Sequence, residues 1–440
     1  MKKISTIILK QYDLLRGNFD SPTSLRLIKA LAFLYLLDKE LAKKNKLFTS
    51  QLQGRLNLQE VTTNEELMLS LRSFLNQNPV LDWVEDMFPD LIRLQNQELF
   101  EKMINNLKEI SVESSSIEVF FECLNTLNTK NRYQLETPSS LCLLSKALLS
   151  NTSYETLYDP AIGVGKLAYE VSLNHPNVKI YGQEIDRFDL TICRMLLALS
   201  GRIHELSSLK EGHTITDPKH RSGNQLQTFD CVVCQPPFGL RDWGMEQVMG
   251  DARFHRGIPP RTGGEYAFIT QVVESLNKHG KGVMILPSGP LFREAREGEI
   301  RKKLIEENLI EAVISLPGNM LYNSAIPVNI VIFNKRKQTS DIFFVNAISF
   351  VDRQRTQSTL TEIAIQEIAK LYHNFEEREE ISRLVSLSDI QDNRYNLMVE
   401  RYVTSKTVQE VFDLESLQQE HQNLMKHLET IQKQLEDILA

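Results

Sequence analysis

The sequence predicts an α/β fold in which a mainly parallel β-sheet follows a helical N-terminal region and precedes a helical tail. From about residue 130, short apolar runs alternate with amphipathic stretches, a pattern typical of parallel strands connected by helices. Before that point, apolar residues recur at helical spacing and strand-like runs are scarce. The end of the chain has heptad spacing. These observations divide the chain into predicted domains at 1–115, 116–350 and 351–440.

Length and composition limit the classes of protein to which the chain can belong. Its 440 residues exceed what one core usually accommodates, so we expect two or three domains. With 42% hydrophobic and 24% charged residues, it is neither collagen-like nor wholly disordered. The net charge of −7 argues against a protein that coats nucleic acid through bulk charge. Its five cysteines suit a reducing compartment, and no apolar run approaches ~18 residues, so we expect a cytoplasmic protein without a membrane span.

Helices are predicted throughout the N-terminal region. The segment RLIKALAFLYLLDKELAKK has an apolar stripe made of Leu27, Ala30, Leu31, Leu34 and Leu37. The later segments NEELMLSLRSFLNQ and LIRLQNQELFEKMINNLKEI repeat the same spacing. We therefore expect a helical domain before the sheet begins.

Strands are predicted at six apolar runs in the middle of the chain. These runs are YETLYDPA, VKIYGQEI, FDCVVCQPP, KGVMILPSG, IEAVISLPG and PVNIVIFNK. Several are apolar throughout, as expected for strands buried on both faces of a parallel sheet.

The final segment, from about residue 411 to 440, has the spacing of a coiled-coil seam. Its apolar positions alternate at intervals of four and three, and they are Leu424, Leu428, Ile431, Leu435 and Ile438. Leu414, Leu417 and His421 extend this seam upstream. A helix with one apolar edge packs either on a partner or back on its own domain.

Two glycines mark the first candidate ligand site. Gly163 and Gly165 lie in YDPAIGVGK, between a predicted strand and a predicted helix, where they permit a tight turn and close approach of a ligand. About twenty residues on, Glu184 ends the next strand, and an acidic group there can accept hydrogen bonds from both hydroxyls of a ribose. Taken separately, the glycines suit an ordinary turn and Glu184 a solvated loop. Their spacing favours a nucleotide-like ligand at the carboxyl edge of the sheet.

A second candidate site, QPPFG at 235–239, directly follows the predicted strand FDCVVC. The two prolines restrict the backbone, so the carbonyl group of Pro236 has a fixed direction. That carbonyl and the amide of Gln235 can together accept both hydrogens of an exocyclic amine, and Phe238 can stack on a flat substrate. The combination predicts methyl transfer to a planar amine, and the alternative is a simple loop turn.

With these motifs in order, the sequence resembles the modification (M) subunits of type I restriction-modification systems, S-adenosylmethionine-dependent N6-adenine DNA methyltransferases. DPAIGVGK resembles the family's cofactor loop DPACGSGG, and FDCVVCQPPFG resembles its catalytic motif FDxxxxNPPFG. The stretch from RTGGEYAF to VNIVIFNK matches the later half of the catalytic domain, and NRYNLMVERYV the junction to the C-terminal helices. The resemblance implies a Rossmann-like methyltransferase domain between an N-terminal helical domain and a C-terminal helical, coiled-coil tail.

The resemblance also implies roles for individual residues. The cofactor S-adenosylmethionine would be bound by Thr137, Pro138, Asp159, Ala161, Gly163, Gly165, Glu184 and His213. Among these, Glu184 would hold the ribose and His213 would contact the adenine of the cofactor. The target adenine, flipped out of the duplex, would be received by Gln235, Pro236, Pro237 and Phe238. No metal site is predicted.

Three residues depart from the family pattern and leave more than one hypothesis open. Gln235 replaces the catalytic asparagine, Lys166 the last small residue of the cofactor loop, and His213 an aspartate or asparagine. The first hypothesis is an active DNA methyltransferase. The second is a catalytically weak or inactive scaffold or DNA clamp of a defence complex. The third hypothesis is a methyltransferase that acts on RNA or on protein glutamine. The N-terminal helices and the heptad tail argue against this third hypothesis.

The resemblance implies several partners. They are double-stranded DNA, a separate specificity (S) subunit that docks on the C-terminal helices, a second M copy and, where the system has one, a restriction subunit. With a net charge of −7, the chain alone is then expected to bind DNA poorly, because a partner supplies much of the contact.

Two further features have structural alternatives. Cys231 and Cys234 form a CxxC inside a predicted strand with no second ligand pair nearby, so we expect core thiols rather than a zinc or redox site. The loop DARFHRGIPPRTGG carries Arg253, His255, Arg256 and Arg261. This loop would either contact DNA phosphates or lie exposed without a ligand.

Overall fold

The fold is described from a computed structural model of the chain. It covers residues 4–110, 115–128, 136–223, 225–322, 324–352 and 357–403, together with the single positions 421, 424, 425, 428 and 431. Within these residues, no helix is both long and apolar enough to cross a membrane.

Eight α-helices precede the first strand in the described part of the chain. They are α1 (Ile4–Leu15), α2 (Ser21–Ala42), α3 (Lys46–Thr49), α4 (Asn64–Gln77), α5 (Phe88–Arg93), α6 (Gln97–Lys108), α7 (Ser116–Asn128) and α8 (Ser139–Leu148). The second helix is central: its N-cap Asp20 accepts a hydrogen bond from the backbone N–H of Thr23, and every residue from Leu27 to Asp38 is buried. The buried surface of α2 is therefore wider than the predicted apolar stripe, because the helix is surrounded by α1, α5, α6, α7 and α10.

A nine-stranded sheet forms the middle of the molecule, in the order β13-β10-β8-β9-β7-β6-β1-β2-β3. The strands are β1 (Thr156–Asp159), β2 (Lys179–Glu184), β3 (Leu209–Glu211), β6 (Phe229–Cys234), β7 (Leu276–Pro287), β8 (Ile310–Leu316), β9 (Val328–Asn334), β10 (Ile342–Asn346) and β13 (Ser382–Val385). Only β9 and β13 run antiparallel to their neighbours. The predicted mainly parallel sheet and its six predicted strands are thus confirmed, whereas β3, β10 and β13 were not predicted. Two short two-stranded pairs lie apart from this sheet: β4 (Arg221–Ser222) with β5 (Gln225–Leu226), and β11 (Val351–Asp352) with β12 (Thr359–Leu360).

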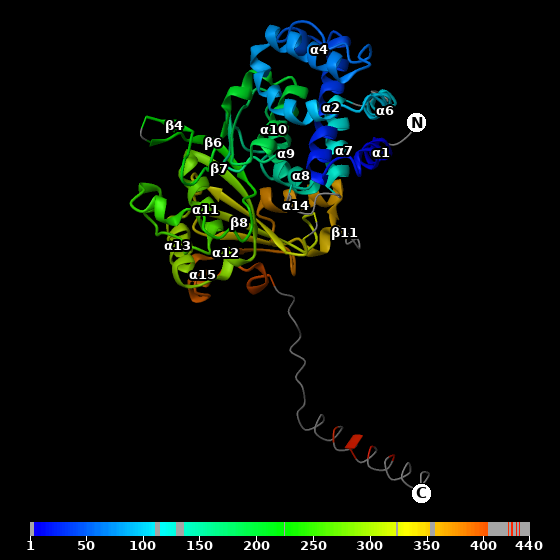
Figure 1. The fold of residues 1–440 in the computed structure, drawn as a ribbon. Coiled ribbons are helices and arrows are strands. Elements are labelled where there is room, and N and C mark those ends of the chain that lie inside the picture. Colours follow the sequence, from blue (N-terminus) through cyan, green and yellow to red (C-terminus); the bar gives the residue numbers. More distant parts are fainter. Residues whose placement is uncertain are drawn as a thin grey trace.

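Helices cover both faces of the sheet. The remaining helices are α9 (Lys166–Ser172), α10 (Arg187–Leu199), α11 (Gly264–Ser275), α12 (Gly289–Phe292), α13 (Ala295–Glu306), α14 (Glu362–Asn374) and α15 (Leu387–Asp392). In β6, Cys231 and Val233 face one apolar cluster, while Val232 and Cys234 face the other. The first cluster joins that face to α8, α9, α10, α14 and the N-terminal helices, and the second contains α11 and α13 (Figure 1).

The chain beyond residue 350 contributes to the same sheet before the tail begins. Helix α14 packs on α8, and β13 pairs with β10. Of the predicted heptad seam, His421, Leu424, Leu428 and Ile431 are helical and exposed. Leu414, Leu417, Leu435 and Ile438 lie outside the described residues. The coiled coil and the domain boundaries stay predictions.

Candidate functional site

A cavity of about 430 Å³ opens at the carboxyl edge of the sheet. The parallel strands β1, β2 and β6 end there, at Asp159, Glu184 and Cys234. Its lining contains Thr137, Asp159, Ala161, Gly163, Glu184, His213, Gln235, Pro236, Pro237 and Phe238. The structure therefore brings the predicted cofactor and substrate residues together, except for Pro138 and Gly165, which do not line the cavity.

The two residues outside the lining shape the backbone next to it. Pro138 is the N-cap of α8, and its carbonyl oxygen accepts from the backbone N–H of Cys142. Gly165 is the N-cap of α9 with φ +83°, and a Cβ there would lie 2.6 Å from the sulfur of Cys193. Only glycine therefore fits at position 165 without displacing α10. Both residues shape the backbone beside the cavity, and their contact with a cofactor stays a prediction.

Asp159 begins the loop between β1 and α9. Its Oδ1 accepts a hydrogen bond of 3.0 Å from the backbone N–H of Ala161. Burial raises the pKa of Asp159 to about 8, an effect that the Ala161 N–H opposes and the nearby Glu184 increases. A cationic ligand in the cavity would reverse this shift, because it would stabilise the carboxylate.

Glu184 connects the loop after β1 with the loop after β2. Its Oε2 accepts from the backbone N–H of Gly163 at 2.9 Å, and its Oε1 accepts from Ile185 and Asp186 at 2.9 Å each. Burial nevertheless raises its pKa. Three of the roughly four acceptor positions of a carboxylate are thus in use. Contact with both hydroxyls of a ribose would require one of these backbone groups to change partner.

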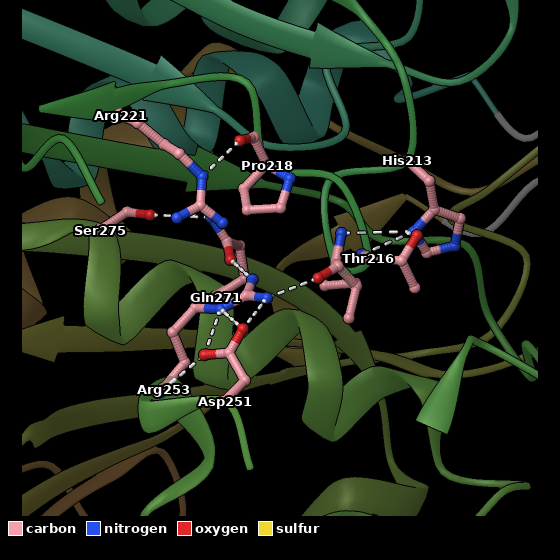
Figure 2. Close-up of polar contacts among 9 residues, drawn as sticks. His213, Thr216, Pro218, Arg221, Asp251, Arg253, Gln271 and Ser275 are labelled. Carbon is pink, nitrogen blue, oxygen red and sulfur yellow. Dashed lines mark hydrogen bonds and ion pairs between the residues drawn. The ribbon is translucent and has the colours of Figure 1, made fainter. Parts of the chain in front are cut away.

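His213 reaches the cavity from the loop after β3. Its Nδ1 accepts from the backbone N–H groups of Ile215 and Thr216, at 3.3 Å each (Figure 2). Desolvation lowers the pKa of His213, so the ring is neutral near pH 7. Because Nδ1 is the acceptor, the proton resides on Nε2, and the ring can donate one hydrogen bond to a ligand.

Lys166, the first residue of α9, also lines the cavity. Its side chain is buried, and its Nζ donates to Oδ1 of Asn125 on α7 at 2.6 Å. The hydroxyl of Tyr322 donates to the same oxygen at 3.2 Å. The ammonium group of Lys166, which stands where the resembling loops have a small residue, is therefore hydrogen-bonded to a neutral amide on the N-terminal helices.

The structure adds two buried carboxylates that the sequence analysis did not identify. Glu136 lines the cavity beside Thr137, and its Oε1 lies 3.9 Å from Nζ of Lys29 on α2. Glu265, the second residue of α11, accepts a 2.8 Å hydrogen bond from the backbone N–H of Gly239, the residue after Phe238. In the sequence, the only feature that could have identified Glu265 is its place in the run GGEYAFI, where a charged residue stands between two glycines and an apolar helix.

Two of the four basic residues in the basic loop differ from both alternatives considered for it. Arg253 is buried and bonds to Asp251 and Gln271, as Figure 2 shows. Arg256 is buried between Glu274 and Glu307. These two guanidinium groups therefore stabilise the fold and are not available to phosphates, whereas His255 and Arg261 are exposed.

The cysteines of β6 are part of the core. Cys231 and Cys234 are fully buried and free, and burial raises the pKa of both thiols. Across the described residues, no group of three or more His, Cys, Asp or Glu side chains is arranged to hold a metal ion.

Comparison with known proteins adds a family and a fold. The family model described as N-6 DNA Methylase matches residues 114–411. The Type I restriction enzyme MjaVIII methylase subunit of Methanocaldococcus jannaschii is 26% identical over 377 residues, which are 80% of this chain and 65% of the relative. The MpnII methylase subunit of Mycoplasma pneumoniae is 24% identical over 360 residues, 76% of this chain and 66% of the relative. The chain thus spans just under two thirds of the length of these curated relatives.

A solved structure has the same fold. The methyltransferase subunit of a type I restriction-modification system from Streptococcus thermophilus superposes with a TM-score of 0.80 at 22% identity, covering 91% of this chain and 99% of that one. This agreement confirms the α/β methyltransferase fold with N-terminal helices. Together with the match over more than half of its residues, it gives the conclusion that the chain belongs to the N-6 DNA methylase family.

Proposed function

We propose that the chain transfers the methyl group of S-adenosylmethionine to N6 of adenine in double-stranded DNA, as the methylation subunit of a type I restriction-modification complex. The observation that carries this proposal is the cavity in which the loop after β1 meets the loop after β6. Its volume of about 430 Å³ lies within the usual range for small-ligand sites, roughly 300–1,000 Å³. Family membership and the names of the relatives support the same activity.

The cavity residues fit this cofactor. S-adenosylmethionine supplies an electrophilic methyl group on a sulfonium centre. Asp159, Glu184 and Asp189 line the cavity, and desolvation raises the pKa of each. Such acids gain stability from a cation, so they suit a ligand with positive charge. Nε2–H of His213 would donate to a ring nitrogen of the cofactor adenine.

The loop after β6 would hold the target base. The carbonyl oxygen of Pro236 and the side-chain oxygen of Gln235 would accept the two N6 hydrogens, which leaves the lone pair facing the methyl donor. Phe238, half-buried against the core, would stack on the purine. Glu265 would position this loop through its bond to Gly239. Because nitrogen is already nucleophilic when so oriented, the site needs no strong base.

The proposed partners rest on the resemblance to type I modification subunits, which the names of the relatives support, and on charge. A chain with net charge −7 binds DNA weakly alone, so we assign much of the DNA contact to a specificity subunit docked on the C-terminal helices. A second copy of this chain and a restriction subunit complete the proposed complex. The five free, buried cysteines support a cytoplasmic site of action.

Gln235 favours one alternative, a weak or inactive scaffold that keeps the fold. Glutamine is one methylene longer than the asparagine of the family motif, and a misplacement of ~1 Å can cost about 100-fold in rate. The amine would then sit out of line with the methyl donor.

One set of measurements separates the two functions. The full chain is titrated with S-adenosylmethionine by calorimetry and then assayed for transfer of a labelled methyl group to DNA with the specificity subunit present. Binding with transfer supports the enzyme, and binding without transfer supports the scaffold. Gln235→Asn should raise the transfer rate of a weak enzyme or create transfer in an inactive scaffold, whereas the control Gln235→Ala should show no transfer. The absence of both binding and transfer would refute the enzyme.

A further inference from the structure

Lys166 places a positive charge in the wall of the cavity. The residue is 3% exposed, and the cavity lining contains no other lysine or arginine among the described residues. The one other basic side chain in the lining, His213, is neutral near pH 7 for the reason given above. Lys166 is therefore the one cationic side chain among the described residues that line this otherwise acidic cavity.

The charge of Lys166 has no close counter-ion. Its Nζ donates to the amide oxygen of Asn125 and lies 5.7 Å from the centre of the Phe121 ring, and no carboxylate in the described part of the chain lies within 4.0 Å of it. Burying an ammonium group against a neutral acceptor is unfavourable relative to water. An anion brought within reach of Nζ would offset this cost, and the four-carbon stem gives the group freedom to turn toward it.

The position of Lys166 indicates which part of a ligand it would meet. It begins α9 at the end of the loop that starts with Asp159, and it shares the cavity wall with Glu136 and Thr137. The carboxyl groups of Asp159 and Glu136 suit the ammonium group of an amino acid, whose positive charge would stabilise the ionised form of Asp159. An amino acid also carries a carboxylate, for which Lys166 is the available partner.

We propose that Lys166 binds the α-carboxylate of the methionine moiety of S-adenosylmethionine. The inference rests on the function proposed above and adds to it a residue of this chain, at a position where the cofactor loops that it resembles have a small side chain. Asn125 and Tyr322 act as positioning residues, because they hold the ammonium group at the wall in the absence of ligand. The alternative is a purely structural tie between α9 and α7.

The test compares two ligands that differ in one group. S-adenosylmethionine and its decarboxylated analogue, which lacks only the carboxylate, are titrated into the full chain by calorimetry. The native protein should bind S-adenosylmethionine about 10- to 100-fold more tightly, the usual size of one charged hydrogen bond. Lys166→Met should lose this preference by weakening S-adenosylmethionine alone, and Lys166→Arg should retain part of it.

A matched control removes a neighbouring charge. Lys146 on α8 pairs with Glu170 of α9 at 3.8 Å and does not line the cavity. Lys146→Met should therefore leave the preference unchanged. The preference of the native chain for S-adenosylmethionine over the analogue is a readout that does not depend on the folding of any variant.

Three results would overturn the inference. Equal affinity of the native chain for the two ligands would mean that the carboxylate has no partner. Equal weakening of both ligands by Lys166→Met would assign Lys166 the structural role instead. Failure of the native chain to bind either ligand would refute the proposed function, and this inference with it, whereas the first two results leave that function intact.

Discussion

Replacement of Asp159 by asparagine should stabilise the ligand-free protein at pH 8 while weakening its binding of S-adenosylmethionine. The carboxyl group is 1% exposed, and burial raises its pKa from 3.8 to about 8. In the unfolded chain the same group is ionised from about pH 4 upward. The folded protein therefore binds one more proton than the unfolded chain between pH 4 and 8, and its stability falls as the pH rises through this window.

The size of the effect follows from the same values. Between pH 3.8 and 8, the ionisation of Asp159 lowers the free energy of unfolding by about 1.4 kcal/mol for each pH unit. The accumulated loss is about 4 kcal/mol at pH 7. Asparagine keeps the acceptor for the Ala161 N–H but buries two new N–H donors, at a cost of about 1–3 kcal/mol. We therefore expect Asp159→Asn to be neutral or destabilising near pH 5 and stabilising by about 2–4 kcal/mol at pH 8.

The assay is thermal unfolding of the ligand-free full chains from pH 5 to 8.5, with calorimetric titration of S-adenosylmethionine alongside. The difference in melting temperature should change sign across this range, while the variant binds the cofactor more weakly throughout. A difference that is constant with pH would show that Asp159 is ionised in the folded protein and would refute the reasoning.

Three other substitutions test single contacts. Gly165→Ala should lower the free energy of unfolding by about 1–3 kcal/mol, measured by urea unfolding, because φ is +83° and the new methyl group would meet a buried sulfur. The control Gly250→Ala, at φ +84° in open space, should lower it less. Equal losses in the two variants would exclude the clash with the sulfur as the cause. Glu265→Leu should reduce the rate of methyl transfer about 10- to 100-fold by releasing the Gly239 N–H. Glu265→Gln, which keeps the acceptor, should stay near the native rate, and an equal loss in both would point to the charge instead. Arg256→Met should cost about 1–3 kcal/mol by leaving two carboxylates unpaired, both of them partly exposed. It should not change the salt dependence of DNA binding, and a reduced salt slope would restore the phosphate-contact hypothesis.

The fold could be predicted from sequence where a residue's neighbours in the chain determine its environment. Strands β1, β2 and β6 are apolar runs that end in functional residues, so their shared edge follows from parallel pairing. Strand β13 escaped notice because it has four residues, two of them not fully buried, at the edge of the sheet. Short edge strands carry too little apolar pattern to be identified.

The side-chain contacts that could not be predicted join distant segments of the chain. The direction of the Lys166 side chain is set by Asn125, 41 positions earlier in the chain. Similarly, Arg256 appeared to belong to an exposed basic loop, but its partner Glu307 lies 51 positions later. Sequence spacing identifies which groups are available for chemistry, but not which of them other side chains have already engaged.

The apolar cluster shared by the sheet and the N-terminal helices has a consequence for how the protein comes apart. Because this single cluster joins residues as far apart in the chain as Ile7 and Tyr372, loss of the early helices would uncover one face of the nine-stranded sheet. Unfolding of the two parts should therefore be a single cooperative event rather than two separate ones. Any force exerted on those helices in an assembly would reach the cavity wall through α7 and the Asn125 amide, so the N-terminal region is mechanically coupled to the candidate site.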